Sequence, residues 1–257
     1  MTDVSNASII DRPAERQADR AAESRLKILN AALTEFSANG LAGARTERIA
    51  QLAGVNKALL YYYFQSKENL YASALEMIAA RIRDTTMNVF LLEASAGERV
   101  LRAAVNHFDR ILTQHEFQSL MQQEMIRLHK GESTAMPVLL KRVFKPVISM
   151  YQSLVREGVA SGELIPVDWM QIHLATLGAN VFYFLSAPVL RMTLNTDLYT
   201  AEALEARRRS MAEYVGMTIF NDRNHGAALA AKVLADSPMP DVDTERFKFW
   251  RADERKE

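Results

Sequence analysis

The stretch GVNKALLYYYFQSKENL, residues 54–70, places three tyrosines in succession at Tyr61, Tyr62 and Tyr63. In a helix, consecutive side chains point about 100° apart around the axis. Three adjacent side chains therefore cannot share one buried face. If this stretch is helical, at least one phenol points outward from a short helix, and the neighbouring sequence indicates what it faces.

The sequence before this stretch predicts two helices. Apolar residues recur every three or four positions across 24–39, and Asn39-Gly40 is a typical helix end. A second, short helix is predicted over 46–53. Gly54 ends it, because glycine readily takes the positive φ of a tight turn.

Two more helices are predicted after Gly54. Asn56 is a good N-cap for a helix that reaches Phe64, and Ser66 caps a fourth helix that continues beyond residue 80. Two short helices joined by a glycine-bearing turn are the helix-turn-helix layout. In that layout the second helix enters the DNA major groove with its N-terminal residues at the base edges.

A helical wheel assigns the tyrosines to different faces. With Leu60 facing the core, Phe64 and Tyr63 lie near the core and Tyr61 lies on the flank. Tyr62 and Ala58 point away from the core, so Tyr62 is the phenol that most needs an external partner. A phosphate oxygen or a thymine methyl group would suit it. Lys57 and Lys67 stand at either end of the helix as phosphate-neutralising charges.

The segment RLKILNAALTEFSANGLAGARTERIAQLAGVNKALLYYYFQSKENLYASAL, residues 25–75, resembles the DNA-binding domain of the TetR family of bacterial transcriptional regulators. The resemblance implies an all-α protein, with an N-terminal three-helix helix-turn-helix domain and a larger helical ligand-binding and dimerisation domain. It also implies a homodimer that binds a palindromic double-stranded DNA operator, usually as a repressor released by a small-molecule effector. The DNA-facing positions that it implies are Arg45, Thr46, Asn56, Lys57, Ala58, Tyr61, Tyr62, Tyr63 and Lys67.

One departure from the family pattern concerns the start of the second helix. Ser or Thr often precedes that helix, but Ala44 and Arg45 stand there. Thr46 is then the candidate for the helix cap. The alternative for the whole segment is a three-helix packing unit without nucleic acid. The net charge of +3 over residues 24–70 and the outward Tyr62 count against it.

The composition is typical of a helical protein of a reducing compartment. Its 257 residues include no cysteine, and the 31 basic and 31 acidic residues balance. No signal peptide is visible, because Ile9 and Ile10 are followed at once by charges. The apolar run from Leu174 to Leu190 is shorter than the ~20 residues of a membrane span, so we expect a buried helix. These features predict a cytoplasmic protein with no membrane partner.

The sequence after residue 70 carries no enzyme signature. We find no P-loop, no dinucleotide-binding glycine pattern, no HExxH motif and no nucleophile elbow. The five histidines include no i, i+4 pair, so neither a metal site nor a cofactor is expected. The sequence therefore predicts that the protein is not an enzyme.

Two stripes are candidates for a ligand site. Glu124 is a carboxylate on an apolar face with Phe117 and Met121, where it needs a partner. That partner is either Arg127, a structural role that we favour, or a ligand. His173, Asn180 and Phe184 form a second stripe, which is either an ordinary core or a ligand contact. The Met- and Phe-rich composition favours an apolar or aromatic effector.

The dimer contacts follow from the resemblance, which implies a four-helix bundle of two late helices from each subunit. Those helices would span about residues 168–187 and 199–221. The expected contact residues are Ala175, Gly178, Ala179, Met211 and Val215.

The sequence thus predicts four segments. An arm over 1–20, which either extends the first helix or is a solvated tail, precedes the helix-turn-helix domain over 21–70. The effector-binding and dimerisation domain covers 71–236, and a polar tail with aromatic residues covers 237–257. The predicted function is a sequence-specific DNA-binding repressor. The alternative is a helical ligand-binding or interaction protein in which the helix-turn-helix serves only packing.

Overall fold

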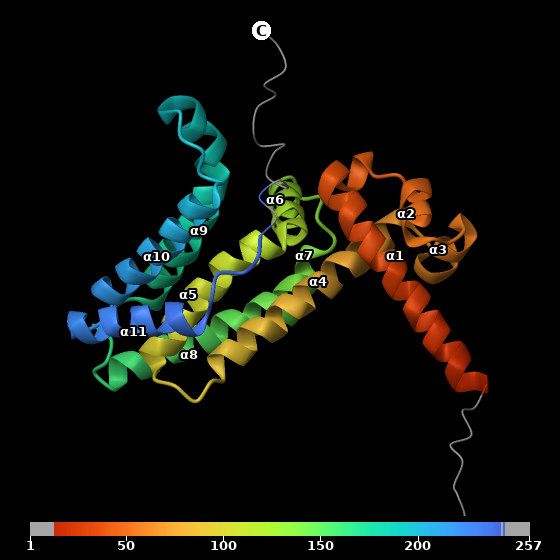
Figure 1. Cartoon of the computed structure of the whole chain (residues 1–257). Coiled ribbons are helices and arrows are strands. Elements are labelled where there is room, and N and C mark those ends of the chain that lie inside the picture. The colour runs from red at the N-terminus through yellow and green to blue at the C-terminus, as the bar shows by residue number, and fades with distance from the viewer. Residues whose placement is uncertain (1–12, 243, 245–257) are drawn as a thin grey trace, which may run out of the picture. The chain divides into compact units, whose positions relative to one another are not determined.

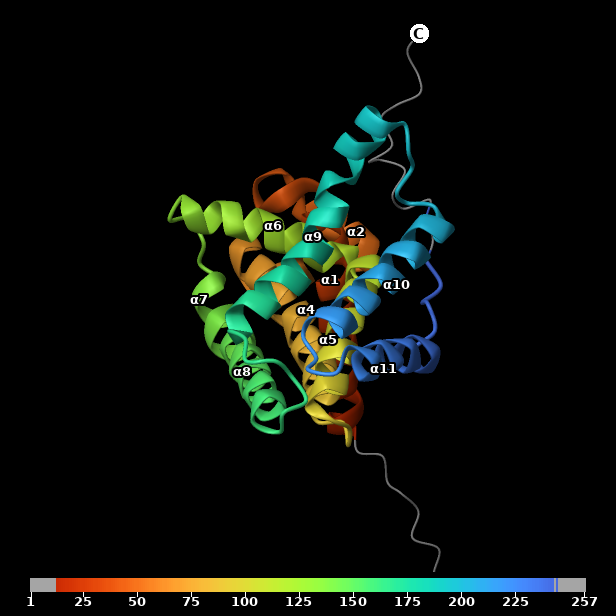
Figure 2. The ribbon, with the colours of Figure 1, turned by 90° about the vertical axis from the view of Figure 1, so that its left-hand side faces the viewer.

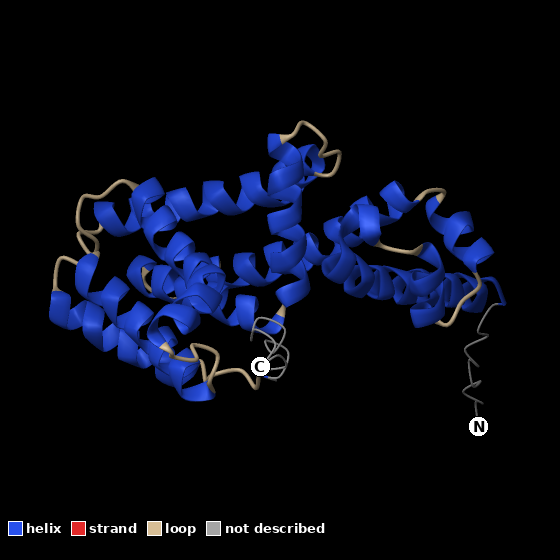
Figure 3. Ribbon diagram, turned by 90° about the horizontal axis from the view of Figure 1, so that it is seen from above, coloured by secondary structure: helices blue, strands red, loops and turns tan. Residues whose placement is uncertain are grey.

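The computed structural model describes residues 13–242 and residue 244, and in this part of the chain the regular elements are helices (Figures 1 and 3). One isolated antiparallel bridge joins Leu164 to Phe220. The all-α prediction is confirmed. The elements are α1 (Pro13–Gly43), α2 (Thr46–Ala53), α3 (Lys57–Phe64), α4 (Lys67–Phe90), α5 (Ala96–Thr113), α6 (His115–His129), α7 (Met136–Leu139), η1 (Leu140–Phe144), α8 (Lys145–Ala160), α9 (Trp169–Leu194), α10 (Ala201–Thr218) and α11 (Arg223–Asp236).

The chain forms two compact units. The first contains residues up to Ile78 together with Ser119–Met136, and the second contains Ala79–Gln118 and the chain from Pro137 onward. Each boundary between them falls inside or beside a helix, so α4 and α6 contribute to both units. The domain boundaries predicted from the sequence remain predictions. Residues 1–12 of the predicted arm, and most of the predicted tail with Phe247, Phe249 and Trp250, lie outside the described residues.

The first unit is built on the apolar face of α1. Ile28 and Phe36 of this face, Ile49 of α2 and Leu60 of α3 are all fully buried, and α2 packs against both α1 and α3. The Phe36 ring also meets Tyr71 of α4 edge to face, with ring centroids 5.1 Å apart, a favoured aromatic geometry. These contacts fix the short helices α2 and α3, which have too few residues to be stable alone.

The first helix is longer than the predicted 24–39. It begins at Pro13, so the alternative in which the charged segment extends the helix is confirmed for the described residues. The predicted stop is also real, because Gly40 has φ 67° and breaks the helical backbone. One more helical turn follows it to Gly43.

The second unit is arranged around α5, which packs against α8, α9, α10 and α11 (Figure 2). Leu101, Val105 and Phe108 of α5 are buried at its centre. A charged pair joins the outer layer to this core. Arg208 of α10 donates to both carboxylate oxygens of Asp109, at 2.7 and 2.8 Å, and to the carbonyl of Ser237 at 2.8 Å. The paired geometry offsets the cost of burying that guanidinium.

Helix α9 differs from the sequence prediction in two respects, its end and its burial. The predicted end of this helix near residue 187 is wrong, because the helix continues through Pro188 to Leu194. A proline cannot donate to the carbonyl four residues earlier; here the phenol of Tyr199 donates to that carbonyl, Phe184 O, at 2.9 Å. The expected burial is incomplete within the protomer, since Phe182, Leu185 and several other apolar residues of α9 are exposed there. By length and apolar composition alone α9 is able to cross a membrane, a test that helices of water-soluble proteins also pass.

The connection between α6 and α8 contains an unusual element. After the short helix α7, residues Leu140–Phe144 form a π-helix that continues directly into α8. A π segment accommodates an additional residue within a helix and is frequent at functional sites. Val143 and Phe144 of this segment face the cavity described below.

Candidate nucleic-acid interface and ligand cavity

The turn between α2 and α3 has the predicted chemistry. Gly54 adopts φ 66° in the left-handed region, and its backbone N–H donates to Gln51 O at 3.2 Å. The Asn56 side chain accepts from the backbone N–H of Leu59 at 2.7 Å and caps α3. Ser66 caps α4 in the same way, accepting from Asn69 N at 3.0 Å. The helix-turn-helix predicted from glycine and cap residues is therefore confirmed.

The side chains of α3 are buried and exposed as the helical wheel predicted. Leu60 and Phe64 are buried, and Tyr63 is half-buried with its ring centroid 5.3 Å from that of Tyr62. Tyr61 is 38% exposed and Tyr62 is 76% exposed. Ala58 is also exposed, on the outward face predicted for it and Tyr62. The outer face of α3 thus presents a phenol beside a small residue, which allows close approach to a flat or grooved partner.

Both predicted phosphate-binding lysines have partners within the protein. Lys57 pairs with Glu47 of α2, which raises the pKa of the ammonium, and its Nζ lies 5.7 Å from the centre of the Tyr61 ring. Lys67 donates to the carbonyls of Ala42 and Ala44, both at 3.2 Å. The Lys67 ammonium therefore also ties the start of α4 to the connection between α1 and α2.

The start of α2 differs from the expectation for Thr46. The cap position is Arg45, whose side chain makes no capping hydrogen bond and is exposed, while Thr46 is the first helical residue and is buried. The backbone N–H of Arg45 donates to Glu35 of α1 at 3.0 Å. The Thr46 hydroxyl lies 3.4 Å from that of Tyr61. A carboxylate from another helix thus takes the place of the expected side-chain cap.

Glu124 lies in the first unit and has the structural partner that the sequence favoured. It is 1% exposed, with Oε1 3.0 Å from Arg127 Nε, and it accepts a hydrogen bond from the Ser133 hydroxyl. Burial, reinforced by the nearby Glu124 carboxylate, raises the pKa of Tyr71. Met121 is buried in the same unit. Neither Glu124 nor Met121 lines the cavity described next.

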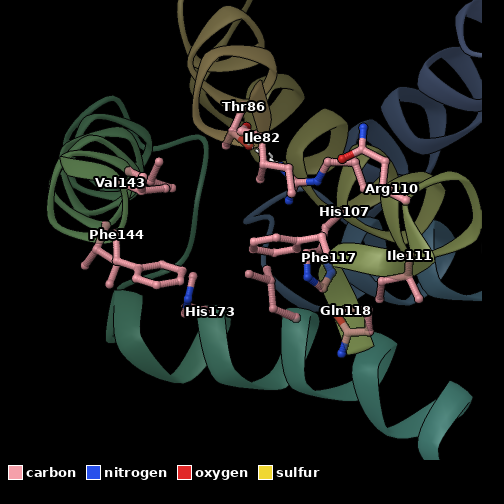
Figure 4. Close-up of a pocket in the computed structure, with 14 residues that line it drawn as sticks. Ile82, Thr86, His107, Arg110, Ile111, Phe117, Gln118, Val143, Phe144 and His173 are labelled. Carbon is pink, nitrogen blue, oxygen red and sulfur yellow. Dashed lines mark hydrogen bonds between the residues drawn. The ribbon is translucent and has the colours of Figure 1, made fainter. Parts of the chain in front are cut away.

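A cavity of about 170 Å³ lies entirely within the second unit (Figure 4). Of the ligand candidates, Phe117 and His173 line it. Asn180 does not line it but supports its wall. The Asn180 amide donates to Ala104 O at 3.3 Å and lies 3.4 Å from His107 Nδ1. Phe184 packs into the core, 5.4 Å from the Phe108 ring centroid. The lining residues are Ile82, Thr86, His107, Arg110, Ile111, Gln114, Phe117, Gln118, Val143, Phe144, Val147, Ile148, His173 and Leu177.

Three polar residues of the cavity, at and just after the end of α5, were not predicted from the sequence. His107, Arg110 and Gln114 are spaced i, i+3 and i+7, so they share one face of α5. A polar stripe of this kind on a helix with a strongly apolar opposite face is the signal that would have identified them. Figure 4 shows His107 and Arg110 beside labelled side chains from α4, α6, η1 and α9 around one space.

The expected dimer residues fall into two groups. Ala175, Gly178 and Ala179 are exposed on α9. Met211 and Val215 are buried at 3% exposure inside the protomer core, so the expectation that they form a dimer contact is wrong. Both lie on the face of α10 that packs inward. The exposed large apolar residues of that helix are Tyr214 and Met217.

The geometry provides no evident metal site. Within residues 13–242 and 244, no group of three or more histidine or carboxylate side chains is placed to hold a metal ion.

Comparisons with known proteins match both parts of the chain. Residues 28–74 match the family described as bacterial regulatory proteins, tetR family, and residues 97–215 match the tetracyclin repressor-like C-terminal domain. The chain is 32% identical to the HTH-type transcriptional repressor NicS of Pseudomonas putida over 184 residues, which cover 71% of this chain and 82% of that protein. It is 31% identical to the HTH-type transcriptional regulator RutR of Escherichia coli over 196 residues, which cover 72% of this chain and 87% of that protein.

Solved structures share the fold at lower identity. A putative transcriptional regulator from Saccharomonospora viridis, solved in complex with choline, superposes with a TM-score of 0.63 at 17% identity. The match covers 78% of this chain and the whole of that one.

Proposed function

The chain belongs to the TetR family of bacterial regulatory proteins, and we propose that it is a homodimeric repressor that leaves its operator when a small molecule enters the cavity of the second unit. The observation that carries the DNA-binding part is the outer face of α3. There Tyr62 is the most exposed tyrosine of the three and Ala58 lies beside it. Because Tyr62 is 76% exposed, packing within its own protomer accounts for little of its surface.

The DNA contacts that we propose divide by chemistry. Ala58 and Tyr62 approach the base edges, where an alanine methyl or a phenol ring contacts a thymine methyl. Arg45, Lys57, Tyr61 and Lys67 meet phosphates, with Lys57 and Lys67 exchanging part of their present hydrogen bonding for phosphate oxygens. Asn56, Thr46 and Tyr63 hold the geometry of the reading helix and contact DNA at its margin.

The dimer that we propose uses the exposed face of α9 together with that of α10. Phe182 and Leu185 of α9 and Tyr214 and Met217 of α10 expose more than half of their surface. Exposed large apolar side chains of this kind are characteristic of interaction sites in proteins. A partner copy is the occupant that lets a two-fold protein read a palindromic operator, with half-sites one helical turn (~34–36 Å) or a multiple apart.

The effector part rests on the cavity, which is largely apolar and carries a few convergent polar groups, as ligand sites do. A neighbour of the same fold solved in complex with choline supports a small-molecule partner for such a domain. The named relatives are transcriptional regulators, which supports a regulatory role over an enzymatic one.

A gel-shift titration of the full chain against the DNA upstream of its own gene tests this proposal. We expect a shift that unlabelled upstream DNA abolishes and a scrambled duplex does not. The variant Ala58→Asp, which places a negative charge on the outward face of α3, is expected to remove the shift without loss of helical circular dichroism. A folded protein that prefers no duplex would favour the alternative in which the helix-turn-helix serves only packing.

A further inference from the structure

Arg110 is the charged residue of the cavity. It projects from α5 among lining residues that are mostly apolar, and none of the fourteen is Asp, Glu or Lys (Figure 4). Burial lowers its pKa to about 10, and no neighbouring carboxylate opposes this shift. The guanidinium therefore remains charged at neutral pH while lying next to an apolar space. Such a charge is costly unless it is paired.

The hydrogen bonds of Arg110 leave one edge available. Its Nη1 donates to the Thr86 hydroxyl and to the carbonyl of Ile82 at 3.3 Å, which fixes the side chain against α4. Among the described residues, Nε and Nη2 have no hydrogen-bond partner and no ion pair is formed. These two nitrogens form the planar fork with which arginine binds a carboxylate through two parallel hydrogen bonds.

The two histidines of the cavity do not add charge. Burial lowers the pKa of His107 to about 3, helped by Arg110 and His173, and burial also lowers the pKa of His173. The Asn180 amide nitrogen can only donate, so His107 Nδ1 accepts from it and the neutral ring carries its proton on Nε2. Arg110 thus gives the cavity a single positive charge at neutral pH.

The size and remaining polar atoms limit the ligand further. A cavity of 150 Å³ lined by apolar side chains is known to hold benzene, and this one is about 170 Å³. Two buried polar atoms of lining residues, His173 Nδ1 and Gln114 Oε1, have no hydrogen-bond partner. The space therefore suits one ring or a short chain with few polar groups.

We propose that the effector is a small organic monoanion, with a carboxylate held by Nε and Nη2 of Arg110 and a one-ring or similarly compact apolar body between Phe117 and Phe144. This inference rests on the proposed function, because it assigns a chemical class to the molecule that causes release. A phosphate dianion is a poorer match, since a single guanidinium would leave one of its charges buried without a partner.

Calorimetric titration of the full-length protein tests the charge requirement directly. The probes are benzoate and hexanoate, with benzamide and hexanamide as neutral counterparts of the same shape. We expect at least one carboxylate to bind about tenfold or more tightly than its amide, as hydrogen bonds to a charged group predict. Equal binding of acid and amide, or binding of none of the four, would overturn the proposal. This comparison needs no variant.

Two variants locate the anion. Arg110→Gln is expected to lower carboxylate affinity about tenfold or more while leaving amide affinity unchanged, and Arg110→Lys should lose less, because it keeps the charge without the fork. Arg223→Gln, at an exposed arginine on α11, is the matched control and should bind as the wild type does. Unchanged carboxylate affinity in Arg110→Gln contradicts the assignment.

Operator binding by the same preparations separates the two proposals. If the wild type binds its operator but discriminates no carboxylate from its amide, the assigned effector class is wrong and the regulator remains. If the wild type binds carboxylates through Arg110 but binds no operator, the proposed function is wrong and the anion site remains.

Discussion

At the scale of single residues, Tyr62 and Tyr63 provide a matched pair. They are adjacent on α3, but Tyr62 is 76% exposed whereas Tyr63 is half-buried. Tyr62→Ala is expected to weaken operator binding more than binding to a scrambled duplex, with an unchanged melting temperature. Tyr63→Ala is expected to lower the melting temperature as well. Binding isotherms on both duplexes and thermal melts check this, and an unchanged operator affinity in Tyr62→Ala would remove the proposed role of that ring.

Glu124 is expected to act on stability and not on effector response. Its carboxylate is 1% exposed and meets Arg127 and Ser133 within the first unit. Replacing it in Glu124→Gln leaves Arg127 without its ionic partner, which should cost about 1–3 kcal/mol in the free energy of unfolding. Urea melts measure the loss, and release from the operator measured at a temperature where the variant is folded should match the wild type. A Glu124→Gln variant of normal stability that is not released from the operator by the effector would show instead that Glu124 contacts the ligand.

His107 should make the protein sensitive to acid. Its ordinary pKa of 6.5 is lowered to about 3 in the folded protein, chiefly by burial. The unfolded chain therefore takes up this proton as pH falls below 6.5 while the folded protein does not. The free energy of unfolding should fall by about 1.4 kcal/mol per pH unit between those values on account of this group.

The test of the His107 prediction compares slopes and not absolute stabilities. Urea melts at pH 7, 6 and 5 on the wild type and on His107→Phe should show a shallower dependence on pH in the variant. Parallel slopes would mean that the ring is already protonated in the folded protein, or exposed to water.

At the scale of helices, two glycines have opposite surroundings. A Cβ at Gly178 on α9 would meet no atom within 4 Å in the protomer, whereas a Cβ at Gly226 on α11 would lie 2.0 Å from the carbonyl oxygen of Gly216 on α10. Gly226→Ala should therefore cost at least about 1–3 kcal/mol of stability through overpacking. Gly178→Leu should leave the protomer folded and weaken the dimer.

Analytical ultracentrifugation and thermal melts distinguish these outcomes. Gly178→Leu is expected to sediment as a monomer at concentrations where the wild type is dimeric, and to bind the operator more weakly. The melting temperature of this monomer should not fall below that of the wild-type protomer. Gly226→Ala is the control that loses stability directly. A Gly178→Leu protein that remains a full-strength dimer would show that the small-residue surface of α9 lies outside the interface.

The helices of the first unit were predictable because local chemistry decides them. Gly54, Asn56 and Ser66 fix the turn and the two caps through their own backbone and side-chain geometry, and the wheel around Leu60 fixes the exposure of the tyrosines. The start of α2 was not predictable in this way, because Glu35 reaches it from ten residues earlier in the chain.

The second unit was less predictable because distant residues decide its features. The continuation of α9 through Pro188 depends on the Tyr199 phenol, eleven positions later. The cavity collects residues from six elements, and the sequence placed Phe117 and His173 in candidate stripes without indicating that Arg110 lines the same cavity. For α10, the resemblance to a family predicts an interface helix but not its outward face: Met211 and Val215 are buried, whereas Tyr214 and Met217 are exposed.

At the scale of the whole molecule, α4 is one of the helices that contribute to both units, and we expect it to carry the response. Its residues up to Ile78 belong to the first unit, and Ile82 and Thr86, further along the same helix, line the cavity. Ala80→Pro removes a backbone donor inside the helix, which kinks or breaks it at a cost of about 3 kcal/mol. The variant is expected to bind both operator and effector while effector no longer releases the operator. Ala80→Ser, which keeps the helix, should release normally, and a normal response in Ala80→Pro would exclude α4 as the connection.

The π segment Leu140–Phe144 has a consequence for how such proteins acquire new specificities. It inserts one additional residue into an otherwise continuous helical stretch, and its Val143 and Phe144 form one wall of the cavity. Deleting a single residue there would restore a regular helix. The residues after the deletion would then rotate by about 100° around the helix axis relative to the residues before it. A different set of side chains would then line this wall of the cavity, while α5 and its Arg110 stay in place. A single codon gained or lost at this position is therefore a short evolutionary route from one ligand shape to another.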